Sequence, residues 1–170
     1  MQFKTISFFA ECNTSNGYYS NHAKRFIQNC KDLNLDYFVD ELKGYGEYYK
    51  NTRMKPAFIL DCLHKFSCPV LWLDIDTIIQ SHPTIDKSAD IMMVKCRQRS
   101  FLGYVHALYF PYEPKIINFV EEWKNKCDSI EGERGDHTLF DELIKKSDIK
   151  YSFFDDFCTY KLAPKSVGKK

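Results

Sequence analysis

The chain has 170 residues, of which 44% are hydrophobic and 16% aromatic, and its 24 basic and 23 acidic side chains leave a net charge of +1. This length is enough for one hydrophobic core but too short for two comfortable domains. The near-zero charge gives no overall signature of nucleic-acid or membrane binding, so any partner has to be recognised by a local site.

Seven cysteines run from Cys12 to Cys158 without a Cys-x-x-Cys pair. An odd number of thiols without metal-ligand spacing favours buried thiols in a reducing compartment over a disulfide framework or a zinc site. The apolar residues near the N-terminus are interrupted by Glu11 too early for a signal peptide, and no stretch reaches the ~20 apolar residues of a membrane span. We therefore expect an intracellular, cytoplasmic protein without a transmembrane segment.

The first part of the chain predicts a βαβ unit. Residues 5–12 form an apolar run typical of a strand, and residues 13–17 form a polar loop with a glycine at its end. Apolar residues at helical spacing then predict a helix from Tyr19, and residues 35–40 predict a second strand. Residues 44–49 lack the spacing of a dinucleotide- or phosphate-binding loop, so we interpret them as a flexible connection.

Pro56 marks the start of the next predicted helix, because a proline loses no hydrogen bond in the first helical turn. Apolar residues then give this helix a broad face that would pack on the sheet. They are Ala57, Phe58, Leu60, Cys62, Leu63 and Phe66. Arg53 and Lys55 place positive charge at the positive end of the helix, a combination that favours a bound diphosphate. The alternative is that both are surface charges before a helix.

The most distinctive stretch begins at Pro69 and ends in two acids. Residues 70–73 form the near-continuous apolar run of a central parallel strand covered on both faces. Alternation along a strand would point Asp74 and Asp76 to one side and Ile75 to the other. Two carboxylates at the carboxyl end of a buried strand suit a hard divalent cation completed by water and phosphate oxygens. The alternative is two solvated acids, since 14 Asp residues give about one such pair by chance.

The second half of the chain predicts three further strands and two helices. The strands are at residues 89–96, 104–110 and 150–156, and the helices begin at Pro114 and after Asp136. A basic turn with Arg97 and Arg99 joins the first two of these strands. These arginines would either contact an acceptor or remain solvated. Residues 161–170 are basic and contain Pro164 and Gly168, so we expect a mobile tail.

Four of these segments resemble the GT-A class of nucleotide-sugar glycosyltransferases, in particular its small bacterial and viral members. They are Arg53-Met-Lys55-Pro56-Ala-Phe-Ile-Leu, the strand that ends in Asp74 and Asp76, Gly103-Tyr-Val-His-Ala107 and Gly135-Asp136-His137. They look like the Lys-Pro helix, the Asp-x-Asp motif, the small-residue strand and the Gly-Asp-Gln helix start of that class. The resemblance covers residues 5–158 and implies an α/β fold, a single GT-A (Rossmann-like) domain with a mixed, mainly parallel sheet flanked by helices.

The resemblance implies a nucleotide and metal site. Ala10 and Glu11, at the end of the first strand, would contact the base, although Glu11 stands where related proteins often have Asp. Lys55, with Arg53 beside it, would bind the nucleotide. Asp74 would reach the ribose or a metal-bound water. Asp76 would bind the metal directly, with Asp74 as the second metal-site acid and Mn²⁺ or Mg²⁺ as the cofactor.

The resemblance also implies that Asp136 would be the general base of an inverting transfer, in which the acceptor hydroxyl must lose a proton to a carboxylate on the opposite side of the sugar. The alternative is that Asp136 caps a helix beginning at His137, since Asp is a preferred N-cap residue. His137 replaces the usual Gln of the motif. The chain also ends without the His that many metal-dependent members use as an extra ligand.

The expected function is therefore metal-dependent transfer of a sugar from a UDP- or GDP-sugar to a hydroxyl of a carbohydrate or glycoconjugate acceptor, with no nucleic-acid partner. We expect residues 1–160 to form the glycosyltransferase domain and residues 161–170 the tail. Two other classes also fit: a haloacid-dehalogenase-like phosphatase with Asp155 and Asp156 as later acids, and a non-catalytic nucleotide- or sugar-binding module. The phosphatase class normally begins its sheet with the acid-bearing strand, whereas here a βαβ unit comes first.

Overall fold

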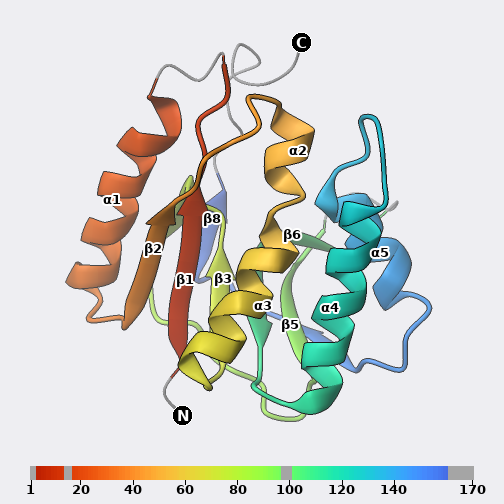
Figure 1. The fold of residues 1–170 in the computed structure, drawn as a ribbon. Helices are drawn as coiled ribbons and strands as arrows, with labels where there is room; N and C mark the ends of the chain where they lie inside the picture. The colour runs from red at the N-terminus through yellow and green to blue at the C-terminus, as the bar shows by residue number, and fades with distance from the viewer. Residues whose placement is uncertain (1–2, 14–16, 97–100, 161–170) are drawn as a thin grey trace.

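The computed structural model describes residues 3–13, 17–96 and 101–160, and a six-stranded sheet forms its centre (Figure 1). In spatial order the strands are β2 (Tyr37–Glu41), β1 (Lys4–Phe9), β3 (Val70–Leu73), β6 (Gly103–Phe110), β5 (Ile91–Lys95) and β7 (Tyr151–Phe153). All run parallel except β6, which is antiparallel to both of its neighbours. The predicted mixed, mainly parallel sheet flanked by helices is confirmed.

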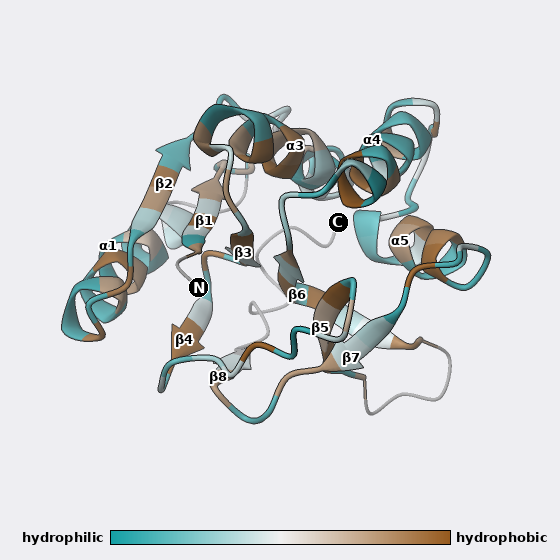
Figure 2. Cartoon of the chain, turned by 90° about the horizontal axis from the view of Figure 1, so that it is seen from below, coloured by the Kyte–Doolittle hydropathy of each residue, from teal (hydrophilic) through white to brown (hydrophobic). Residues whose placement is uncertain are grey.

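Helices and a small second sheet cover the two faces of the central sheet. The helices are α1 (Tyr18–Asp32), α2 (Tyr48–Thr52), α3 (Lys55–Phe66), α4 (Pro114–Asp128) and α5 (Asp136–Ile144). Side chains of α3, α4 and α5 pack on one face, and α1 packs on the other with β4 (Thr77–Ile79) and β8 (Cys158–Tyr160) (Figure 2). The result is a sheet buried between two apolar layers.

Strand β3 is the centre of both layers. Val70 and Trp72 belong to the core under α3 and α4, while Leu71 and Leu73 belong to the core on the α1 side. All four side chains are buried, as expected of a strand covered on both faces. Of the two neighbours of β3, however, only β1 is parallel to it, and β6 is antiparallel.

The strand predicted to carry both acids ends before them. Residues 74–77 form a turn that is closed by the Thr77 N–H donating to the Asp74 carbonyl at 2.9 Å, and the Asp74 N–H donates to His106 O at 2.8 Å. The chain then leaves the main sheet as β4, which pairs antiparallel with β8. The alternation argument therefore does not apply beyond Leu73, because pairing with a distant strand redirects the backbone.

The segment expected to be a flexible connection is tied to the end of β1. Cys12 and Gly46 form a β-bridge, and the Tyr45 N–H donates to the Asn51 side chain at 2.7 Å. A Cβ at Gly44 would lie 2.8 Å from the Glu11 carbonyl oxygen, so only glycine fits this approach. The short helix α2, which begins inside this segment at Tyr48, was not predicted.

The remaining sequence-based expectations concern the cysteines, the membrane and segments outside the described residues. All seven cysteines lie within the described part of the chain, and there none forms a disulfide and five are buried. The loop residues 14–16, the basic turn with Arg97 and Arg99, and the tail from residue 161 lie outside that part, so the division at residue 160 stays a prediction. Of the helices in the described ranges, none is long and apolar enough to cross a bilayer.

Candidate active site

Lys55 forms the centre of a buried ion cluster at the carboxyl edge of the parallel strands. It is the first residue of α3, and the residue is only 4% exposed. Its Nζ lies 2.9 Å from Asp74 Oδ1 and 2.7 Å from Asp136 Oδ2, and donates to Val105 O at 3.2 Å. The alternative that Lys55 is a surface charge is therefore wrong, and one ammonium joins the end of β3, the start of α5 and β6.

The charge of Lys55 is stabilised by its partners. Burial alone would disfavour the ammonium, but the carboxylates of Asp136 and Asp74 outweigh it and raise the Lys55 pKa above its usual value. The ammonium also lies 5.4 Å from the centre of the Trp72 ring. Because Trp72 Nε1 donates to Asp74 Oδ1 at 3.0 Å, that carboxylate is oriented by two donors.

Asp76 differs from Asp74 in having no such cation. The residue is 4% exposed, and burial, followed by the charge of Asp74, raises the Asp76 pKa to about 7. Within the described residues Asp76 forms no ion pair, although Arg25 Nη2 donates to its backbone carbonyl at 2.8 Å. A buried carboxylate that lies near a second carboxylate is destabilised by it, and a cation bound at that position would offset the repulsion.

Asp74, Asp76 and Lys55 line one cavity of about 90 Å³ with Ala10. The cavity has a largely apolar wall that includes Phe8, Tyr19, Tyr48 and Trp72. Asp74, Asp76, Lys55 and Ala10 were all predicted to lie at this edge, and the structure brings them together. We call this space the active-site cavity below.

Asp136 reaches the same cluster from the start of α5. It is the first residue of α5 and is 4% exposed, and its backbone carbonyl accepts from Trp123 Nε1 at 3.1 Å. The N-cap residue of α5 is Gly135, and no side chain caps this helix. The alternative that Asp136 caps a helix beginning at His137 is therefore wrong, while its role as a base stays a prediction.

Two predicted nucleotide-binding residues make contacts elsewhere. Glu11 Oε1 accepts from the N–H of Ser20 at 2.8 Å and from its hydroxyl at 2.6 Å, which satisfies a backbone donor in the first turn of α1. Arg53 donates to the carbonyls of Tyr49, at 3.2 Å, and of Ile130. Neither residue lines the active-site cavity, and their predicted contacts with a nucleotide remain untested.

Three residues near the site were missed by the sequence analysis. Asn51 is buried, and its Nδ2 lies 3.4 Å from Cys12 Sγ, so it holds the wall of the cavity. Tyr48 keeps its phenolic proton, since burial and the charge of Asp136 raise its pKa to about 12. His106 is neutral, because burial lowers its pKa to about 4. No local pattern marks these residues, although the run of tyrosines around Tyr48 is a visible aromatic signal.

The sheet order and its single antiparallel strand define a mixed α/β fold that solved glycosyltransferases share. The structure is similar to a glycosyltransferase involved in the glycosylation of the major capsid of PBCV-1, with a TM-score of 0.69, 11% identity, and coverage of 92% of this chain and 82% of that one. It is also similar to the apo form of the glycosyltransferase GlyE of Streptococcus pneumoniae TIGR4, with a TM-score of 0.60 and 11% identity. That match covers 92% of this chain and 46% of GlyE.

These likenesses show the fold alone, because the sequence identities are low. No known family profile and no curated protein matches the sequence.

Proposed function

We propose that this chain is a metal-dependent glycosyltransferase that moves a sugar from a UDP- or GDP-sugar to a hydroxyl of a carbohydrate or glycoconjugate. The observation that carries the proposal is the cluster of Lys55 with Asp74 and Asp136, beside the buried acid Asp76. Cation-binding acids and a candidate base thus meet at the carboxyl ends of parallel strands, where open α/β sheets bind ligands. The similar fold of two glycosyltransferases supports the same class.

The donor set suits Mn²⁺ or Mg²⁺. Asp76 and Asp74 supply carboxylate oxygens, and within the described residues no group of three metal-binding side chains is formed. Such a pair suits a hard cation that takes its other ligands from phosphate oxygens and water. When bound there, the metal supplies Lewis-acid stabilisation of the diphosphate that leaves the sugar.

Lys55 and Asp136 are the chain's own catalytic machinery in this proposal. The Lys55 ammonium holds Asp74 and Asp136 in place and adds positive charge beside the departing diphosphate. Asp136 accepts the proton of the acceptor hydroxyl as that oxygen attacks the anomeric carbon. The protonated phenol of Tyr48, at the edge of the cavity, is a hydrogen-bond donor for the nucleotide or the sugar.

The phosphatase alternative loses support from the position of its second pair of acids. Asp155 and Asp156 are exposed and do not line the active-site cavity. An assay of released products distinguishes the binding-module alternative from the two enzymes. A transferase releases nucleoside diphosphate, a phosphatase releases inorganic phosphate, and a binding module releases neither.

The test is a thermal-shift screen of UDP- and GDP-sugars with and without Mn²⁺, followed by assays for both released products. A ligand that binds only the folded protein raises the melting temperature with its concentration. Asp76→Asn should abolish the metal-dependent shift and leave the fold intact, whereas the exposed control Asp155→Asn should behave as wild type. Equal stabilisation of the wild type by nucleotide with and without chelator would contradict the metal dependence.

A reducing, cytoplasmic compartment is part of the proposal. It is supported by seven thiols that form no disulfide in the described part of the chain, five of them buried.

A further inference from the structure

Two larger cavities lie in succession beside the active-site cavity, each sharing lining residues with the one before it. The first, of about 660 Å³, shares Cys12 and Tyr48 with the active-site cavity, and we call it the middle cavity. The second, of about 560 Å³, shares Lys50, Arg53 and Ile130 with the middle cavity, and we call it the α3 groove. Both lie in the range of about 300–1,000 Å³ that is usual for small-molecule sites. We call these two neighbouring cavities together the trough, which extends from the residues shared with the active-site cavity along α3.

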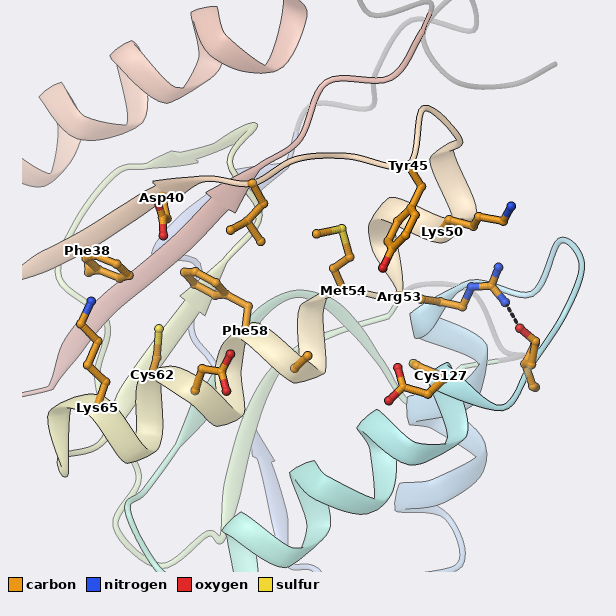
Figure 3. A pocket seen from close by; sticks show the side chains of 15 residues that line it. Phe38, Asp40, Tyr45, Lys50, Arg53, Met54, Phe58, Cys62, Lys65 and Cys127 are labelled. Atoms are coloured by element: carbon orange, nitrogen blue, oxygen red, sulfur yellow. Dashed lines mark hydrogen bonds between the residues drawn. The ribbon is translucent and has the colours of Figure 1, made fainter.

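The α3 groove combines an aromatic floor with an exposed tyrosine (Figure 3). The rings of Phe38 and Phe58 are parallel within 5°, with centres 6.0 Å apart. Tyr45 lines the same groove and is 66% exposed, the largest exposure among the large hydrophobic side chains of the described residues. The exposed ring of Tyr45 offers flat apolar surface beside polar groups, which suits the apolar faces and the hydroxyls of sugar rings.

The basic side chains of the trough are already engaged. Lys50 Nζ lies 2.8 Å from Glu47 Oε1, and Arg53 donates to two backbone carbonyls. Lys65 Nζ lies 4.0 Å from the centre of the Phe38 ring. Acids also line the trough, among them Asp40, Asp61, Asp128, Glu131 and Glu133. The acids that line the trough outnumber its three basic side chains, so the charge favours a neutral ligand over a negatively charged one.

The wall of the trough leads to the proposed base. The loop after α4 contributes Ile130 and Glu133 to the middle cavity and continues through Gly135 into Asp136. A Cβ at Gly135 would lie 3.6 Å from the ring of Tyr49, so this loop packs directly on α2. A chain lying in the middle cavity is thus next to the segment that positions Asp136.

We propose that the trough binds a neutral oligosaccharide several residues long, whose terminal hydroxyl is the acceptor. This inference rests on the proposed function and names its acceptor class. In the transfer, the acceptor oxygen forms a bond to the anomeric carbon and gives its proton to Asp136. The bond from that carbon to the diphosphate breaks, and its electron pair leaves with the nucleoside diphosphate.

The test uses neutral oligosaccharides of one to six residues, drawn from gluco- and manno-series, and an oligogalacturonide as the anionic probe. Nucleoside diphosphate release gives KM for each, and amide chemical shifts of labelled protein give binding without turnover. We expect KM to fall with chain length and shifts to change around residues 45–57. Tyr45→Ala should raise KM for the hexasaccharide about three- to tenfold and leave KM for the monosaccharide unchanged.

The matched control is Tyr112→Ala, which removes another exposed tyrosine, 40% accessible, outside the trough. Equal effects of the two substitutions, a KM independent of chain length, or preference for the oligogalacturonide would overturn the acceptor site. A protein that releases no nucleoside diphosphate with any donor refutes the proposed function instead. In that case the chemical shifts still decide whether the hexasaccharide occupies the trough, and the absence of shift changes there overturns the inference.

Discussion

Lys55 Nζ and Asp136 Oδ2 lie 2.7 Å apart, and each belongs to the first residue of a helix. A positive charge at a helix N-terminus is unfavourable on its own, whereas a carboxylate there is favourable. Asp136 and Asp74 therefore offset the unfavourable position of the Lys55 charge. The ion pair between Lys55 and Asp136 also joins the start of α3 to the start of α5. A substitution at either position acts on both helices.

The first prediction concerns the stability of this pair. Lys55→Met should lower the free energy of unfolding by about 3–5 kcal/mol, because it leaves a buried carboxylate without its cation. Adding Asp136→Asn should recover part of this loss, so the double variant should be more stable than Lys55→Met alone. Urea unfolding of the single and double variants measures the coupling. Lys115→Met, which removes a surface ammonium paired with Asp90 at 2.9 Å, should be nearly neutral.

If the losses of unfolding free energy in the two single variants add up to the loss in the double variant, Lys55 and Asp136 do not interact. The assignment of the ion cluster would then be wrong.

The second prediction concerns pH and Asp76. Its pKa is raised from 3.8 to about 7. The free energy of unfolding therefore falls as pH rises above 3.8, and the loss is complete above about pH 7. In the presence of chelator, Asp76→Asn should therefore be more stable than wild type at pH 8, by roughly 2–4 kcal/mol, and similar to wild type near pH 4. Unfolding curves at both values measure the difference. A constant difference across this range would refute the raised pKa.

The third prediction concerns turnover and Asp136. If this carboxylate is the base, Asp136→Asn should lower kcat about 10²- to 10⁴-fold at saturating donor and acceptor. The control is Asp141→Asn, which alters another buried acid of α5, one that accepts from the Leu102 N–H at 2.7 Å and pairs with Lys145. This control should lose stability but keep its kcat. A kcat within a few-fold of wild type for Asp136→Asn would remove Asp136 from the mechanism.

The fourth prediction concerns the backbone beside the cavity. A Cβ at Gly44 would lie 2.8 Å from the Glu11 carbonyl oxygen and 2.9 Å from Asn51 Nδ2, so Gly44→Ala must displace one of them. We expect a loss of about 1–3 kcal/mol in urea unfolding. Gly135→Ala is the control, because its Cβ would meet its nearest neighbour at an ordinary 3.6 Å. If both variants have the same free energy of unfolding, the backbone around Gly44 accommodates a Cβ without loss of stability, and the prediction is wrong.

Local periodicity was enough to predict the central strand β3, the helices α1, α3, α4 and α5, and the acids at the sheet edge. It did not predict β4 and β8, because their pairing joins residues about half the chain apart and leaves no local trace. For the same reason, the ion pair between Lys55 and Asp136 was not predicted. Their residue types were visible in the sequence, but the contact depends on how α3 packs on β1 and β3 and how α5 packs on β6.

The contacts of the indole rings make the protein its own optical probe. It has two tryptophans, and the indole N–H of Trp72 donates to Asp74 while that of Trp123 donates to the Asp136 carbonyl. A ligand that changes the charge at Asp74 or moves the start of α5 must therefore alter the surroundings of an indole. Emission from Trp72→Phe and Trp123→Phe proteins would report the two sides of the cavity separately, without any added dye.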